Sequence, residues 1–184
     1  GATEYTLVTV AVDDTGSVSS FAALLQKMLQ TSVQACKKSP RSDNIMVRVI
    51  RFSDSYQHNI DEVHGFKPLS LIDPSKDYTM PQPGGGTPLY DAAYSVLGAT
   101  NAYAKDLVDQ DFGVNAIVFI ITDGGDTGSI ATKKMVRDEA RASVSGEVLE
   151  SMISVLVGIN TSSPGLLQML QDFKDEAELT HFID

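Results

Sequence analysis

The chain has 184 residues, 42% hydrophobic and 21% charged, a balance typical of a folded protein, so we expect one domain over residues 1–184 and neither a disordered nor a fibrous chain. Lys and Arg number 14 against 24 Asp and Glu, and the net charge of −10 argues against binding to nucleic acid or to anionic membranes. No stretch approaches the roughly 18 consecutive apolar residues that a membrane-spanning helix needs, so membrane insertion is not expected.

The first third of the chain alternates strand and helix patterns. Residues 5–12, YTLVTVAV, are β-branched and aromatic, which predicts a buried strand. From Val18 to Cys36 apolar residues recur at intervals of three and four, which predicts an amphipathic helix packed on a sheet. Cys36 is the only cysteine, so an internal disulfide and a Cys-based zinc cluster are excluded. Residues 45–52, IMVRVIRF, predict a strand with one more exposed face or near the sheet edge, and residues 59–72 have room for a short strand.

A long loop interrupts this alternation. Residues 73–86 contain three prolines and end in three consecutive glycines, and loops of such length in compact domains are usually functional or disordered. Thr87 and Pro88 then predict the start of a helix, because threonine caps helices and proline is favoured in the first turn. The apolar stripe of this helix continues to Leu107.

The last third returns to strand and helix patterns. Its most apolar segment, NAIVFIIT at 115–122, predicts a buried strand that stops at Asp123. The further expected elements are a helix at 131–144, a strand at 152–159, a helix that starts at Ser163-Pro164, and a short strand at 181–183.

This order of elements predicts an α/β fold with a doubly wound, mostly parallel central sheet flanked by helices on both faces, as in Rossmann-like proteins. Functional sites in such folds lie at the carboxyl ends of the strands, where the crossover loops meet. Two of the most apolar strands end there in an aspartate, at Asp13 and Asp123.

A repeated tetrapeptide suggests one function for these acids. Asp14-Thr15-Gly16-Ser17 returns as Asp126-Thr127-Gly128-Ser129, and acid proteases carry Asp-Thr-Gly-Ser once in each lobe. That chemistry needs two aspartates that face each other within a nearly all-β chain. The helical patterns are incompatible with such a fold, so we reject a protease and expect Asp126 to be a helix cap or a loop residue.

The segment that begins one residue earlier, at Asp13, indicates metal binding instead. Asp13, Thr15 and Ser17 form Asp-x-Thr-x-Ser at a strand end, where alternate side chains point the same way. Thr87 adds a third hydroxyl from the end of the glycine loop, and Asp123 adds a second carboxylate. Such an all-oxygen set suits a hard cation such as Mg²⁺. Helix capping remains a second possible role for the hydroxyls.

Three segments, VAVDDTGSV, PGGGTPLYDAA and VFIITDGGD, together resemble the metal-ion-dependent adhesion site (MIDAS) of von Willebrand factor type A (vWA) domains, also the fold of integrin inserted domains. They occur in the family's order and at its usual intervals. The resemblance implies a site for Mg²⁺ or Mn²⁺ that engages an Asp or Glu of a protein partner. The ligands it implies are Asp13, Thr15, Ser17, Thr87 and Asp123.

Two residues depart from the pattern of the family. Thr15 replaces a serine, which keeps the hydroxyl oxygen and adds a methyl group. Asp14 stands where the family often has threonine or another small residue. Strand alternation turns Asp14 away from the converging side chains, so we expect it to face solvent.

Two alternatives to a metal-dependent binding module stay open. Receiver domains and haloacid-type phosphatases also place acids after the first strand and use Mg²⁺ for aspartyl phosphotransfer. The phosphatase pattern needs an acid where Thr15 stands, and the receiver pattern needs a lysine where Thr161 and Ser162 stand. The second alternative is a degenerate vWA assembly module without a physiological metal. Since no catalytic constellation is evident, we expect a binding module rather than an enzyme.

Overall fold

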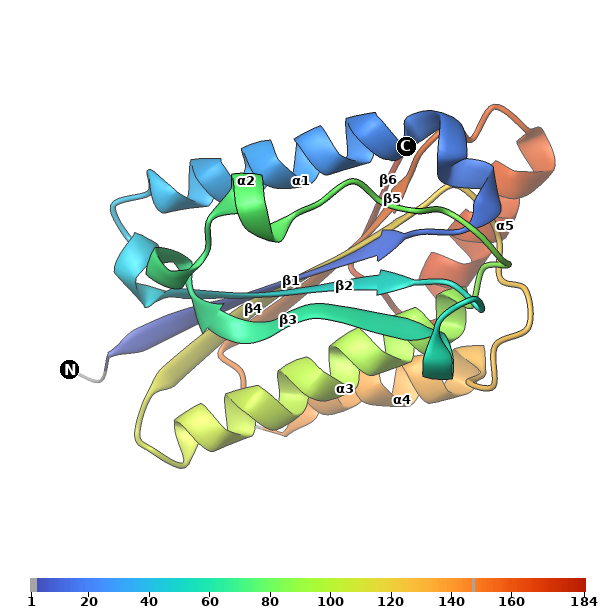
Figure 1. Cartoon of the computed structure of the whole chain (residues 1–184). Coiled ribbons are helices and arrows are strands. Elements are labelled where there is room, and N and C mark those ends of the chain that lie inside the picture. Colours follow the sequence, from blue (N-terminus) through green and yellow to red (C-terminus); the bar gives the residue numbers. More distant parts are fainter. Residues whose placement is uncertain (1–2, 147) are drawn as a thin grey trace.

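A mostly parallel sheet forms the centre of the computed structural model, which describes residues 3–146 and 148–184. Within these residues the sheet has six strands in the order β3-β2-β1-β4-β5-β6 (Figure 1). The strands are β1 (Glu4–Asp13), β2 (Ile45–Phe52), β3 (Ile60–Pro68), β4 (Gly113–Thr122), β5 (Ser151–Gly158) and β6 (His181–Ile183). Every neighbouring pair is parallel except β2 and β3. The expected α/β fold is therefore confirmed, with β3 as an antiparallel edge strand.

Helices lie on both faces of this sheet (Figure 1). They are α1 (Ala22–Lys37), α2 (Pro74–Asp77), α3 (Leu89–Val108), α4 (Lys133–Ser145) and α5 (Pro164–Glu176). Buried side chains of α1 pack with Val10 and Val12 of β1, whereas α3, α4 and α5 pack on the opposite face. In the part of the chain that the structure covers, none of the helices has the length and apolar character to cross a membrane.

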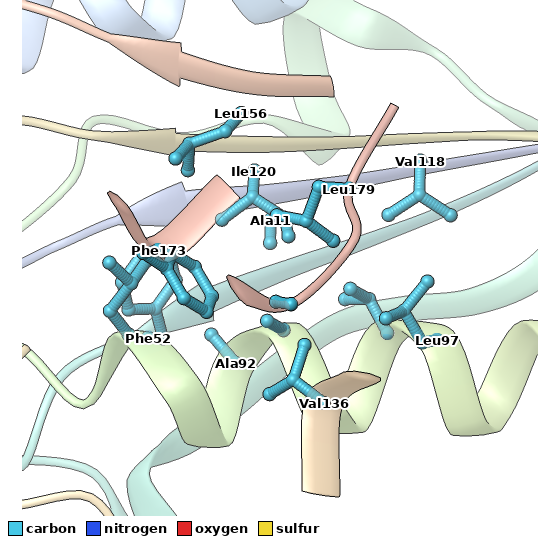
Figure 2. Packing of buried hydrophobic residues seen from close by; sticks show 14 of the residues in the cluster. Ala11, Phe52, Ala92, Leu97, Val118, Ile120, Val136, Leu156, Phe173 and Leu179 are labelled. Atoms are coloured by element: carbon cyan, nitrogen blue, oxygen red, sulfur yellow. The ribbon is translucent and has the colours of Figure 1, made fainter. Parts of the chain in front are cut away.

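The larger core cluster lies between the sheet and the three helices α3, α4 and α5. Figure 2 shows Ile120 of β4, Leu156 of β5 and Phe173 of α5 within it. Ala92, a small residue on α3, lets this helix approach the strands closely. This cluster supports the β1 and β4 strands, whose ends carry the predicted site.

The register of β1 and β4 places their carboxyl ends at the same edge of the sheet. Val12 pairs with Ile121 in this parallel ladder, so the residues that follow each strand emerge side by side. Asp13 and Asp123 belong to these two strand ends. The sheet itself therefore brings the two acids together.

Two local expectations differ from the structure. The loop at 73–86 contains the four-residue helix α2, which Asp73 caps by accepting a hydrogen bond from the Ser75 amide at 3.1 Å. Pro88 lies at the N-cap position of α3 instead of in its first turn. Neither difference changes the order of strands and helices.

Phe173 is a suitable test of the core, because it is 2% exposed and its ring lies 4.9 Å from that of Tyr90. We expect Phe173→Ala to lower the free energy of unfolding by about 3–5 kcal/mol, through lost burial and a residual cavity. Urea denaturation measures this loss. Leu167→Ala, on the same helix and 37% exposed, is the control and should have a much smaller effect. Equal losses in the two variants would contradict this account of the core.

Candidate functional site

Five oxygen-bearing side chains form one connected cluster at the carboxyl edge of β1 and β4. Asp13 Oδ1 accepts hydrogen bonds from the amide (2.9 Å) and the hydroxyl (2.5 Å) of Thr15. The Thr15 hydroxyl lies 3.3 Å from Ser17 Oγ and accepts a hydrogen bond of 3.3 Å from the Thr87 hydroxyl. Ser17 Oγ donates to Asp123 Oδ1 at 2.9 Å. The structure thus brings together all five side chains singled out from three distant segments.

The second oxygen of Asp13 ties β1 to β4. Asp13 Oδ2 accepts a hydrogen bond from the Thr122 hydroxyl at 2.8 Å and from the Asp123 amide at 3.4 Å. Thr122 was not identified from the sequence, although its place directly before Asp123 at a strand end was an available indication. Because both of its oxygens are engaged, the fully buried Asp13 has a fixed orientation.

The cluster contains two acids, and neither has a basic partner in the part of the chain that the structure describes. Burial raises the pKa of Asp123, and the neighbouring charge of Asp13 adds to this rise, while the hydrogen bond from Ser17 opposes it. Among the ion pairs of residues 3–146 and 148–184, none includes Asp13 or Asp123. Buried carboxylates in this situation are costly unless a cation or a proton neutralises them.

The donor set fits a hard cation. The two carboxylates and three hydroxyls supply only oxygen ligands, which suit Mg²⁺ and Mn²⁺. The five side chains include no thiol or imidazole, the typical ligands of zinc. Within the described residues, no group of three or more His, Cys, Asp or Glu side chains is placed to hold a metal, so the hydroxyls are needed to complete a coordination shell. Ser17 lies on the exposed side of the cluster, whereas Thr15 and Asp13 are buried beneath it.

The hydroxyls of Thr15 and Thr87 do not act as helix caps. Thr15 precedes a 3₁₀ helix, Gly16–Phe21, but its side chain makes no capping hydrogen bond. Thr87 precedes α3, whose N-cap is Pro88, and the Thr87 hydroxyl donates to Thr15 instead of accepting from an amide of this helix. Both hydroxyls point into the cluster instead, so capping does not explain these residues.

The expectation that Asp14 faces solvent is wrong. Its side chain is 1% exposed, and its Oδ2 accepts a hydrogen bond from the Tyr56 hydroxyl. Burial raises the pKa of Asp14, and its Oδ1 has no hydrogen-bond partner among the described residues. Strand alternation gives only the direction in which Asp14 points. It does not reveal that the segment after β2 places Tyr56 over this carboxylate.

Residues that follow β2 hold the glycine loop that leads to Thr87. The Gly86 amide donates to Asp54 Oδ1 at 2.7 Å, and the Asp54 amide donates to the Gly86 carbonyl at 3.2 Å. Gly85 has a φ of +74°, a backbone conformation that favours glycine. A Cβ at this position would also lie only 2.8 Å from Ser53 Oγ, so there is no space for a side chain. Ser53 and Asp54 were not identified from the sequence, although they also follow a buried strand at this edge.

Solved structures with the same fold include a pilus adhesin and a protein of the mussel byssus. The pilus adhesin SpaC from Lactobacillus rhamnosus GG matches with a TM-score of 0.67 and 11% identity over 100% of this chain and 29% of its own. The mussel byssus proximal thread matrix protein 1, with a zinc-occupied MIDAS motif, matches with a TM-score of 0.59 and 17% identity over 98% of this chain and 42% of its own. The present chain therefore spans less than half the length of either protein.

A third similar structure is the N-terminal domain of TFIIH p34, with a TM-score of 0.61 and 14% identity over 98% of this chain and 91% of its own. At these identities the likeness establishes the fold alone. No protein-family model matches the sequence, and no curated protein is similar to it in sequence. The resemblance to vWA domains is thus supported by structure, including a neighbour with a MIDAS motif, and not by sequence comparison.

The repulsion between the two acids gives a test without metal. The pKa of Asp123 is raised in the folded chain, so Asp123 keeps its proton to a higher pH there than in the unfolded chain. The free energy of unfolding therefore falls as the pH rises through the folded pKa. In EDTA at pH 7, Asp123→Asn should therefore unfold at a higher urea concentration than the wild type. The difference should shrink as the pH falls toward 3.8, the ordinary value of an aspartate.

The exposed Asp106, near the opposite end of α3, provides the matched control. Asp106→Asn should leave the urea midpoint near that of the wild type at both pH values. A wild type more stable than Asp123→Asn at pH 7 in EDTA would contradict the prediction that burial and the charge of Asp13 make the ionised Asp123 unfavourable.

Proposed function

We propose that this chain is a metal-dependent protein-binding module, in which a divalent cation, Mg²⁺ or Mn²⁺, engages an Asp or Glu of a protein partner. The proposed ligands are Asp13, Thr15, Ser17, Thr87 and Asp123. The observation that carries the proposal is the pair of buried carboxylates, Asp13 and Asp123, which lie in one hydrogen-bonded cluster. Among residues 3–146 and 148–184, no basic side chain pairs with either acid. A cation would neutralise both acids at once.

The charge of the protein explains why a cation would be needed for an acidic partner. With a net charge of −10, the chain repels a carboxylate at long range. A bound divalent cation would supply a concentrated positive charge at the exposed side of the cluster, beside Ser17. The adhesin and the MIDAS-containing byssus protein among the similar structures are in keeping with a protein-interaction role.

Aspartyl phosphotransfer is less well supported by the geometry. A phosphoryl acceptor must present a carboxylate oxygen to the incoming phosphorus atom. Asp13 is fully buried, and its two oxygens already accept hydrogen bonds from Thr15 and Thr122. A metal-free assembly module with the same fold is distinguished from the proposed function by direct titration with metal.

Isothermal titration with Mg²⁺ should give saturable binding to the wild-type protein. Asp13→Asn keeps the size of the side chain and removes one charge from the cluster, so we expect its affinity to fall by more than about tenfold. Asp106→Asn, which changes the same kind of residue near the far end of α3, should bind like the wild type. Equal binding heats in the wild type and Asp13→Asn would exclude this metal site.

Thermal unfolding gives an independent measure of occupancy. A Mg²⁺ concentration about 100 times Kd should stabilise the wild type by about 2.7 kcal/mol, and Asp13→Asn should gain less at the same concentration. An unchanged Tm of the wild type at 10 mM Mg²⁺, which is about 100 times a Kd of about 100 μM, would contradict the proposal.

Partner binding should require both the cation and one carboxylate of the partner. A partner captured on the immobilised wild type in Mg²⁺ should be released by EDTA and should not bind immobilised Asp13→Asn. Amide substitution of each exposed Asp and Glu of that partner in turn should identify one position that abolishes binding. Capture that is equal in Mg²⁺ and in EDTA would favour the metal-free assembly module.

A further inference from the structure

The second copy of the repeated tetrapeptide, residues 126–129, packs against the start of α3. Asp126 Oδ1 accepts a hydrogen bond from the Tyr90 amide at 3.1 Å, and Ser129 Oγ accepts one from the Asp91 amide at 3.1 Å. These amides belong to the first turn of the helix, where N–H groups lack partners within the helix itself. Asp126, expected to be a helix cap or a loop residue, is a loop residue that caps a helix distant in sequence.

Thr127, in the middle of this tetrapeptide, makes a reciprocal pair of hydrogen bonds with Thr87. The Thr87 amide donates to Thr127 Oγ1 at 2.8 Å, and the Thr127 amide donates to the Thr87 carbonyl at 2.7 Å. The close approach depends on Gly86, since a Cβ there would lie 2.9 Å from Thr127 Oγ1. The backbone of Thr87 is thereby held on both sides.

Holding the backbone of Thr87 also sets the direction of its side chain. The Thr87 hydroxyl donates to Thr15 Oγ1 at 3.3 Å, which is its contact with the cluster. The threonine χ1 angle is stiff, so the position of the hydroxyl follows that of the backbone. Thr127 itself is exposed and contributes no buried core surface. A substitution that removes the Thr127 hydroxyl should therefore leave no cavity in the core.

We infer that Thr127 is a positioning residue for the Thr87 hydroxyl, and that it couples this hydroxyl to the loop that carries Asp123. The inference rests on the proposed function in so far as the cluster binds a cation. Thr127 follows Asp123 by four positions in one connection, whereas Thr87 belongs to another. The reciprocal pair therefore joins the two segments that complete the cluster around Asp13 and Thr15.

Thr127→Val removes the hydroxyl with little change of shape, and Thr127→Ser retains it. In metal-free protein, the valine variant should speed hydrogen exchange of the Thr87 amide roughly three- to tenfold, as the loss of one hydrogen bond predicts. It should also shift the Thr87 methyl resonance. In Mg²⁺ titrations its affinity should fall about tenfold, as for other residues that orient ligands. Thr127→Ser should restore all three measurements.

The matched control is Thr132→Val, in the same connection. Thr132 Oγ1 accepts a hydrogen bond from the Met135 amide at 3.2 Å and caps α4. Its loss should lower the Tm, as cap removal does, and leave the Thr87 exchange rate, the Thr87 methyl resonance and the Mg²⁺ affinity unchanged. This variant separates a positioning effect from a general loss of stability.

The measurements separate the inference from the proposed function. Wild-type exchange and an unshifted Thr87 methyl resonance in Thr127→Val would overturn the inference, whether or not Mg²⁺ binds. An unaltered Mg²⁺ affinity in Thr127→Val, with a wild type that binds, would overturn it equally. A wild type that binds no Mg²⁺ would refute the proposed function, while the exchange and methyl measurements would still decide whether Thr127 positions Thr87.

Discussion

Two buried carboxylates of like charge lie at the adjacent ends of β1 and β4, and the surrounding loops are arranged around them. Asp13 is held from three directions, by the amide and hydroxyl of Thr15 and by the hydroxyl of Thr122. Asp123 is held by Ser17. These hydrogen bonds orient the acids but leave their negative charge in place. This edge of the sheet is therefore unfavourable unless a proton or a cation neutralises the acids, and the proposed function assigns that role to a cation.

The sheet brings the acids together, whereas the hydroxyls depend on loops. Parallel pairing of β1 with β4 makes the two strand ends coincide regardless of loop structure. Thr87 reaches the same place only because Gly85 adopts a left-handed backbone and Gly86 lets Asp54 and Thr127 approach. The loop from β2 and the loop from β4 thus hold the glycine segment from its two sides. Strand pairing therefore places the two acids, and hydrogen bonds between loops place Thr87.

The residues that were predicted to converge, and that lie together in the structure, share a local pattern. Apolar strands that stop at an acid, and hydroxyls at alternate positions, are visible in short windows, and they located Asp13 and Asp123. The edge strand β3 was less clear, because its residues Ile60–Pro68 are mostly half-buried and show no alternation. Thr122 and Thr127 form hydrogen bonds with Asp13 and Thr87, which lie 109 and 40 positions away in the sequence. No periodic pattern indicates such contacts. The burial of Asp14 was not predicted for the same reason, because Tyr56, which covers it, belongs to a distant segment.

The repeated tetrapeptide shows how strongly context decides the use of a motif. In the first copy Gly16 opens a 3₁₀ helix, and the hydroxyls of Thr15 and Ser17 point toward the strand-end acids. In the second copy Gly128 has a φ of +75°, and the side chains turn toward the amides of α3. The difference begins one residue earlier, where the first copy follows Asp13 at a strand end and the second follows Gly125 within a loop. The first copy contributes the hydroxyls of Thr15 and Ser17 to the acid cluster, and the second copy uses Asp126 and Ser129 to cap a helix start. The role of the tetrapeptide therefore depends on the path of the backbone and not on its four residues alone.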